Sequence, residues 1–524
     1  MDPLLQVLSC SAFFVQLLLA SFGGLVLSGS LLTLTFASGL GAKPLSAGES
    51  SAGLPGRPLN APEGPRQASG APLPDIRHAR QQPKNRLSSR DDFLSRQKSV
   101  LNSQASGFSL PEAEAFSPTT TVRVEVNGVV GALDYVGSAV DRAANSAAGF
   151  PLLNALSLNQ DTRLTVDTSF TGQDLLRVRL RSGNFGASGF FSNPPTPLTR
   201  LEVAFQEPLC RPDDDSCNRN LVTVNRAYLQ VPLGSQVRIS AGSRLMQRDI
   251  LPVWPSVYTD SPVLEMFQRA GAAGAYSRRL GSGVGAWWQP QGALKGVSLA
   301  YVAVMPLGAN GSPGRGGWFT AAADQASTVQ LAYTRPSWNL TATYSRNGQR
   351  ALLRGTPLAS QLAADSREGA LHSWSLAGYW QPSRPGWLPA ISAGWGLDRF
   401  AFARYPLAGL SGARTSSWSV GLSWSDALRP GNSVSLALGA PAHVIALDGL
   451  EDGSPNDSGL AFELATRIRW SDAFSLTPAV FWLTRPRGAM ASTASLSAAL
   501  GPEEPGEGSR LSVWGALVRG TLRF

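Results

Sequence analysis

Histidine and cysteine are scarce in this sequence, with three of each among 524 residues, and Cys10 lies in an apolar N-terminal segment. So few of these residues exclude an enzyme built on a multi-histidine metal site, and they exclude a small scaffold held by many disulfides. Charged residues make up only 15% of the chain, which is low for a water-soluble protein of this length. The mean hydropathy is close to zero, so the chain is not a bundle of apolar helices either.

Motifs of the common enzyme classes are also missing. The sequence has no glycine-rich phosphate loop ending in Lys-Ser/Thr, no His-Glu-x-x-His and no Gly-x-Ser-x-Gly between a strand and a helix. The histidines, His78, His372 and His443, are far apart in the chain. We therefore expect no catalytic residue, no metal site and no cofactor. A Ser–His pair that uses His372 remains an alternative.

Lysine is scarce too, although the net charge is +9. The only lysines are Lys43, Lys84, Lys98 and Lys295, so the positive charge comes almost entirely from arginine. Outside one linker the arginines do not gather into a basic arm or helix face, which argues against a nucleic-acid partner.

The first 118 residues divide into two segments. Residues 3–42 carry no charge, are rich in leucine and end in small residues, which predicts a signal peptide over 1–42. A retained membrane anchor or a different start codon are the alternatives, because no basic residue precedes the apolar run. Residues 43–118 are rich in Pro, Gly, Ser, Ala and Arg, which predicts a disordered linker. Its basic middle is either solvated or in contact with an anionic cell-wall polymer such as peptidoglycan.

From residue 119 to the end, the pattern has a period of two. In 175–184, Leu176, Val178 and Leu180 alternate with arginines, and in 415–424 tryptophan, valine and leucine alternate with serine and glycine. Similar segments recur down the chain, and many end in Trp or Tyr. One apolar face, one small or charged face and aromatic ends are typical of a transmembrane antiparallel β-barrel. A soluble sandwich is the weaker alternative.

The last segment and the connections support the barrel. Residues 509–524 end in Phe524 with apolar or small residues at every second position, which resembles the closing strand of outer-membrane barrels. Walking back from this end, long and short connections alternate as far as residue 199. Counting from 162–168 and including 199–207 gives 16 strands, and the alternating stretch 119–129 would be a seventeenth. Because bacterial barrels have even counts, we predict about 16 strands over 119–524, with 18 as the alternative.

Three segments carry a resemblance to a known family. Residues 168–185 (TSFTGQDLLRVRLRSGNF), 225–234 (NRAYLQVPLG) and 252–258 (PVWPSVY) resemble the cyanobacterial outer-membrane porins. These porins, often called iron-uptake porins, carry an OprB-type carbohydrate-selective barrel. The resemblance covers 116–524 and is specific in 162–285. No surface-layer homology domain is recognisable in 43–118, so the resemblance does not extend to wall attachment.

The resemblance implies a location and a function. It implies a passive outer-membrane channel for inorganic ions, iron among them, and small hydrophilic solutes, surrounded by lipid. Porins of this size are often trimers, so a homotrimer is expected. A sugar-selective pore, or a structural barrel that tethers the membrane through the linker, are the alternatives.

Pore-lining residues are predicted on the wall and on the third outer connection, 244–280. The resemblance implies that this loop folds inward, and Ser261-Pro262 followed by Gly271 predicts a short helix within it. Arginines at lumen-facing positions and acidic loop residues opposite them would set the field across the aperture. The predicted residues are Arg177, Arg179, Arg181, Arg200, Arg226, Arg238, Asp249, Asp260 and Glu265. Alternatively, these arginines pair with wall carboxylates and only hold the barrel's shape.

Two cysteines fall in one predicted outer loop, 208–221. Cys210 and Cys217 are close in sequence and would face an oxidising compartment, which predicts a local disulfide. Three consecutive aspartates between them suggest a cation site, but adjacent residues in a short loop cannot easily share one ion. A solvated acidic tip is the preferred interpretation.

Overall fold

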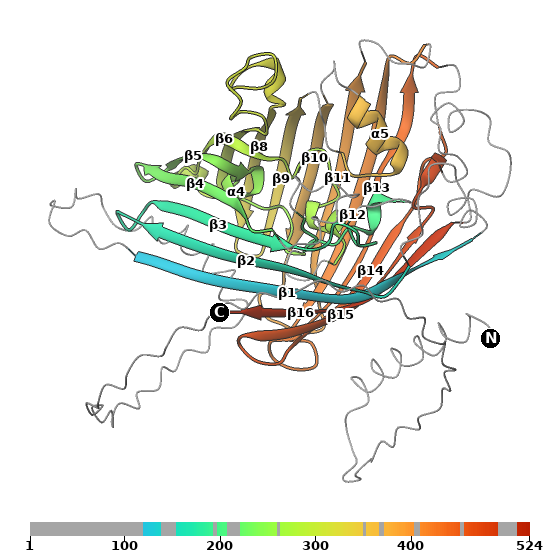
Figure 1. Cartoon of the computed structure of the whole chain (residues 1–524). Helices are drawn as coiled ribbons and strands as arrows, with labels where there is room; N and C mark the ends of the chain where they lie inside the picture. Colours follow the sequence, from blue (N-terminus) through green and yellow to red (C-terminus); the bar gives the residue numbers. More distant parts are fainter. Residues whose placement is uncertain are drawn as a thin grey trace, which may run out of the picture. The chain divides into compact units, whose positions relative to one another are not determined.

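The chain folds as one closed barrel of sixteen antiparallel strands. The computed structural model describes residues 119–137, 154–191, 196–206, 221–258, 263–348, 353–365, 371–402, 409–450, 455–490 and 511–524. The strands follow one another around the barrel in chain order, and β1 pairs with β16 to close it (Figure 1). The prediction of a 16-stranded barrel is confirmed. The predicted signal peptide (1–42) and linker (43–118) lie outside the described residues.

The elements have the following bounds. The strands are β1 (Thr119–Val136), β2 (Ser157–Ser169), β3 (Leu175–Gly183), β4 (Thr223–Leu233), β5 (Val237–Met246), β6 (Leu280–Trp288), β7 (Val297–Met305), β8 (Ala326–Arg335), β9 (Trp338–Asn347), β10 (Leu371–Trp380), β11 (Ala390–Ala401), β12 (Gly412–Ser425), β13 (Ser433–Asp448), β14 (Ala461–Arg469), β15 (Phe474–Thr484) and β16 (Ser512–Arg523). Short helices occupy the connections: η1 (Pro197–Thr199), α4 (Gln247–Ile250), η3 (Glu265–Arg269), η4 (Gly292–Leu294), η5 (Ala321–Ala323), α5 (Pro357–Asp365) and η6 (Gly488–Met490). In this part of the chain no helix combines the length and the apolar character that crossing a membrane requires.

Two strand predictions were wrong, and their errors cancel in the count. Residues 119–136 are the full-length strand β1, which the predicted sixteen had left out. Residues 199–207 are not a wall strand but part of the connection between β3 and β4. With 199–207 as a strand, the segment 185–198 before it would have to be a short turn, and it is too long for one. It belongs to one long connection, 184–222.

Long and short connections now alternate over the whole barrel. The short ones are 170–174, 234–236, 289–296, 336–337, 381–389, 426–432 and 470–473, and the long ones lie at the other end. Short turns face the periplasm in outer-membrane barrels, so the long loops face the cell exterior. The start of β1 and the end of β16 both lie at the short-turn end.

The two faces of each strand differ as the alternation predicted. Apolar side chains on the outer face are exposed: Leu331, Leu340 and Leu376 are each about half exposed. Their strand neighbours on the inner face are buried and are polar or small. Near the long-loop ends, Trp482 stacks on Trp514 with ring centroids 5.2 Å apart, which is the position of an aromatic belt. The chain is therefore an integral β-barrel of the outer membrane.

Closure of the barrel is a backbone contact between the two ends. Phe524 N donates to Val124 O at 3.0 Å, and Val124 N donates to Phe524 O at 3.1 Å. The whole of β16 pairs with β1 on one side and β15 on the other. The prediction that 509–524 forms the closing strand is confirmed in its described residues.

Candidate pore constriction

The third long connection, loop L3 (residues 247–279), folds into the barrel. Its residues contact the inner faces of distant strands: Val257 N donates to Ser392 Oγ of β11 at 3.0 Å. Tyr276 Oη lies 2.9 Å from Thr343 Oγ1 of β9. The predicted short helix is the 3₁₀ helix η3, which ends where Ala270 and Gly271 take positive φ angles. The predicted helix start at Ser261-Pro262 lies outside the described residues.

One carboxylate of the wall anchors the middle of L3. Glu463, on the inner face of β14, accepts hydrogen bonds from the backbone N–H groups of Val263 (2.9 Å) and Leu264 (2.5 Å). It also accepts one from Tyr258 Oη at 2.9 Å. All four residues are buried, so these donors have little access to water. Glu463 therefore fixes L3 across the lumen.

Close backbone contact fixes the following part of L3. A Cβ atom added at Gly271 would lie 2.4 Å from Ser419 N and 2.5 Å from Gly394 O, both on the wall. Gly271 also has a φ angle of 67°, which residues with a side chain rarely adopt. Glycine is required here by both space and conformation.

Substitution of Gly271 tests the seating of this loop. We expect Gly271→Ala to unseat L3, because its methyl group would collide with wall backbone that cannot move without breaking sheet hydrogen bonds. Single-channel recordings should show unstable current levels, and the heat-induced unfolding on SDS gels should occur at lower temperature. Gly311→Ala, in an outer connection with nothing within 4 Å of the added atom, is the matched control. Equal behaviour of the two variants would contradict the proposed seating.

The second long connection, loop L2 (residues 184–222), joins L3 inside the barrel. Leu201 forms an isolated antiparallel bridge with Leu264, with hydrogen bonds from Glu202 N to Val263 O and from Glu265 N to Arg200 O, each 2.9 Å. Leu201, within the predicted strand 199–207, therefore takes part in a bridge between two loops rather than in the wall. Arg200 is not a wall residue, and its predicted place on a strand was wrong.

Apolar packing holds both loops against one side of the lumen. On β15 and β16 the lumen-facing positions near the long-loop end are apolar, and Phe481 and Leu517 are buried there with Phe190 of L2 and Phe267 of L3. Phe190 and Phe481 meet edge to face at 6.4 Å. Burial of such side chains stabilises the loop by roughly 1.5–3 kcal/mol each. The lumen is consequently narrowed from this side.

Four arginines from three loops surround one carboxylate at the junction of L2 and L3. Glu265 binds Arg200 Nε at 2.8 Å and Arg278 Nη1 at 3.2 Å, and it also pairs with Arg269 and Arg354. We call Arg200, Arg269, Arg278 and Arg354 the arginine cluster. Four guanidiniums around one carboxylate leave three positive charges in excess over Glu265, and Glu202, which faces Arg278, offsets part of this excess.

The charge of this cluster is fixed and partly open to water. Burial would raise the pKa of the Glu265 carboxyl, but the surrounding guanidiniums, Arg354 foremost, hold it well below its usual value. The Glu265 side chain is only 4% exposed, whereas those of Arg278 and Arg354 are 21% and 22% exposed. The exposed surface of the cluster is therefore positive.

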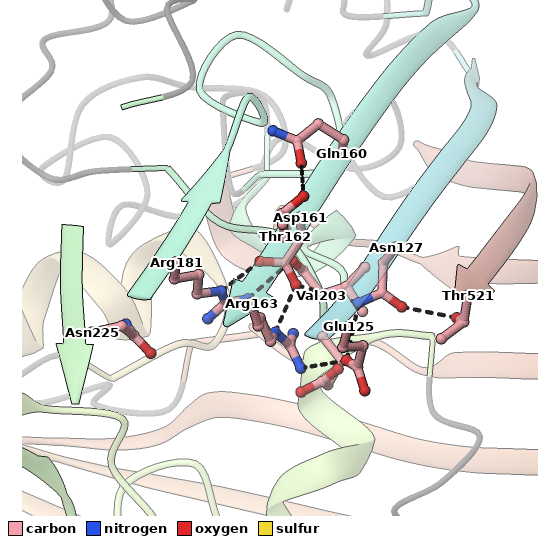
Figure 2. A network of polar contacts seen from close by, with 12 residues as sticks. Glu125, Asn127, Gln160, Asp161, Thr162, Arg163, Arg181, Val203, Asn225 and Thr521 are labelled. Atoms are coloured by element: carbon pink, nitrogen blue, oxygen red, sulfur yellow. Dashed lines mark hydrogen bonds and ion pairs between the residues drawn. The ribbon is translucent and has the colours of Figure 1, made fainter. Parts of the chain in front are cut away.

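Two of the three arginines of the predicted ladder on β3 form ion pairs with carboxylates of the wall. Arg177 pairs with Asp167 at 2.6 Å and Arg181 with Asp161 at 2.5 Å, both from β2. Arg179 lies between them and, among the described residues, donates only to Thr165 Oγ1, at 2.9 Å. Figure 2 shows Arg163 and Arg181 converging on Asp161, with Arg163 continuing to Glu125 of β1. Two of the three ladder residues thus match the alternative of structural ion pairs.

The remaining predicted pore residues are dispersed. Arg226 of β4 pairs with Asp249 at the start of L3. Arg238 donates to Gln173 O at 3.2 Å near the short-turn end, away from the constriction. Asp260, Cys210 and Cys217 lie outside the described residues, so the disulfide remains a prediction.

Sequence reasoning missed three members of the cluster: Arg269, Arg278 and Arg354. Arg269 follows Glu265 by four residues, a spacing that indicates an ion pair on a short helix. Arg354 is 89 residues from its partner Glu265, and no local pattern marks it.

A closed sixteen-stranded barrel with an inward-folded third loop and a charged constriction defines a porin-like outer-membrane barrel. No family model matches the sequence. An uncharacterized protein of Synechocystis sp. (strain ATCC 27184 / PCC 6803 / Kazusa) is 28% identical over 347 residues, which cover 61% of this chain and 58% of that protein. The match thus spans less than two thirds of the relative.

Solved structures of outer-membrane porins are similar to the chain. OprB of Pseudomonas putida has a TM-score of 0.49 at 10% identity, covering 83% of this chain and 98% of that one. An anion-selective porin from Comamonas acidovorans has a TM-score of 0.44 at 13% identity, covering 78% and 100%. OmpF of Salmonella typhi has a TM-score of 0.45 at 11% identity, covering 77% and 97%. The resemblance to the cyanobacterial iron-uptake porins remains a prediction.

Proposed function

We propose that the protein is a passive diffusion channel for inorganic ions and small hydrophilic solutes, with a preference for anions. The observation that carries the proposal is the arginine cluster, with its three positive charges in excess over Glu265. Rings of basic side chains at a constriction lower the energy of an entering anion and raise that of a cation. The wall supports this sign, because Arg179 lacks a carboxylate partner among the described residues.

The preference for anions affects which solutes the channel would pass. An iron cargo is implied by the sequence resemblance alone, and the cluster would favour an anionic iron chelate over the free cation. The sugar-selective alternative rests on the same resemblance. The tether alternative depends on residues 43–118, which lie outside the described residues, as does any peptidoglycan contact. The homotrimer also remains a prediction.

The test is planar-bilayer conductance of the refolded full-length protein under a KCl gradient. We expect stepwise open channels and a reversal potential of the sign that chloride permeation gives. A cation-selective potential would overturn the anion preference. A well-folded barrel without conductance would overturn the channel itself and favour a structural role.

The charges of Glu202 and Glu265 beside the arginine cluster should not change between pH 8 and 5. Glu202 of L2 faces Arg163 and Arg278, which lower its pKa to about 2 although burial raises it, and the pKa of Glu265 is also far below its usual value. Because both pKa values are lowered, both carboxylates remain ionised until the pH falls far below 5. The change in reversal potential caused by Arg278→Ala/Arg354→Ala should therefore be the same at pH 8, 6.5 and 5. A change that becomes steadily different toward pH 5 would show that these carboxylates take up protons.

A further inference from the structure

Four basic residues form a row across neighbouring strands on the barrel's outer face. The sheet register places Arg346 of β9 opposite His372 of β10, His372 opposite Arg399 of β11, and Arg399 opposite Arg414 of β12. We call these four residues the basic row. No carboxylate interrupts the row within these strands.

The basic row faces outward. Arg346 shares its strand face with Leu340, which is 50% exposed, and Arg399 shares its face with Trp395, which is 46% exposed. The neighbours on the opposite face, such as Ser345 and Ser373, are fully buried inside the barrel. The row is therefore separate from the lumen and from the arginine cluster.

The depth of the basic row corresponds to the outer headgroup layer. Each member lies within three residues of the strand end that leads into a long loop, which is the exterior end of the barrel. Tyr344 and Trp374 lie two residues closer to the membrane centre, about 7 Å along the strand. Such aromatic side chains mark the membrane–water interface, so the row lies just outside it.

Two members of the row have no anionic partner in the described residues. Like charges directly opposite one another on a sheet are destabilising. Arg414 pairs with Asp448 at 3.4 Å, and both side chains are partly exposed. Arg346 and Arg399 form no ion pair with any described residue. In the sheet register His372 alone separates them, so the two positive charges are close together. An external anion would relieve this repulsion.

The histidine in the middle of the row is held in place. Its Nδ1 lies 2.8 Å from Tyr344 Oη, and its ring stacks on Tyr344 and Trp374 at 6.1 and 6.2 Å. The Nε2 atom of His372 makes no hydrogen bond with a described residue. It can therefore bind a ligand that lies between the guanidiniums of Arg346 and Arg399.

We propose that the basic row binds the phosphate-bearing headgroup of an outer-leaflet lipid. Guanidiniums bind phosphate oxygens through paired hydrogen bonds, and Arg346 and Arg399 flank His372 for such contacts. Below the row, Trp374 and Leu376, 41% and 52% exposed, offer an apolar surface for the acyl chains of the same lipid. The charge, the depth and the apolar surface together favour a lipid over a free anion.

The experiment compares bisphosphorylated lipid A with dephosphorylated lipid A of the same acyl chains, each titrated onto the refolded full-length barrel in detergent. We expect the wild-type protein to bind the bisphosphorylated form at least about tenfold more tightly. Arg346→Ala/Arg399→Ala should weaken that binding by about tenfold, and the Gln/Gln double variant should do the same. Arg335→Ala/Arg384→Ala, which removes two basic residues at the short-turn end, is the matched control and should bind as the wild type does.

Folding is checked by heat-modified migration on SDS gels, so that a misfolded variant is not scored. Equal binding of the two lipids, or full binding by the folded double variants, would overturn the proposal. If inorganic phosphate alone binds the basic row as tightly as the lipid does, the row is a site for a free anion. That result would also overturn the proposal. The channel's reversal potential is recorded separately, because the basic row lies outside the lumen.

Discussion

Replacement of Arg278 and Arg354 together by alanine is expected to reduce the anion-type reversal potential by about half or more. The double variant leaves Arg200 and Arg269 around Glu265, so the excess over Glu265 falls from three positive charges to one. Arg278 and Arg354 are the most exposed members of the arginine cluster, so their charges act most directly on a passing ion. The measurement is the reversal potential of single channels under a KCl gradient.

Two control variants separate charge from shape. Arg278→Lys/Arg354→Lys keeps the charge and should retain most of the preference. Arg384→Ala removes a positive charge from an exposed short turn and should change nothing. An unchanged potential in the alanine variant would mean that the cluster does not line the ion path, and the proposed selectivity would then have to be abandoned.

The other large effect is expected at Glu463. Glu463→Ala removes the acceptor of two buried backbone N–H groups and one hydroxyl, and each donor left without a partner costs about 1–3 kcal/mol. This loss should release the middle of L3 from β14 while the barrel stays closed. We expect fluctuating single-channel currents and rapid protease cleavage within L3.

The control for this prediction is Tyr258→Phe. It removes only the hydroxyl donor and leaves both backbone hydrogen bonds to Glu463, so it should give a much smaller effect. Steady currents and a protease-resistant L3 in Glu463→Ala would show that the other contacts of L3 seat the loop without Glu463.

The period of two predicted the barrel but could not distinguish every wall strand from a buried loop. Alternation arises wherever one face of an extended segment is buried and the other is polar. Within the predicted strand only residues 200–203 meet this condition: Leu201 pairs with Leu264 of L3, and Leu201 and Val203 are buried whereas Arg200 and Glu202 are less so. At Leu201 the extended conformation was predicted correctly, but its pairing partner is loop L3 rather than a neighbouring wall strand.

The site was predictable only where its contacts are local. The inward loop was implied by the resemblance to known porins, and Ser-Pro and Gly predicted the short helix in which Glu265 lies. Arg354 reaches Glu265 from another loop, and the pairing of Arg177 with Asp167 depends on strand register. Strand register and loop folding are tertiary properties. The sequence alone could therefore not show that the arginines of β3 pair with the wall while those of the arginine cluster surround Glu265.

Pairing of β1 with β16 is the step that closes the barrel during folding. Its contacts join residues as far apart as Glu125 and Arg523, 398 positions along the chain. Pairings of such sequence separation form late, because the entropy of closing the intervening chain opposes them. Until then both terminal strands present unpaired backbone, the kind of edge at which β-proteins aggregate. The barrel therefore has two open strand edges throughout its assembly, until β1 and β16 pair.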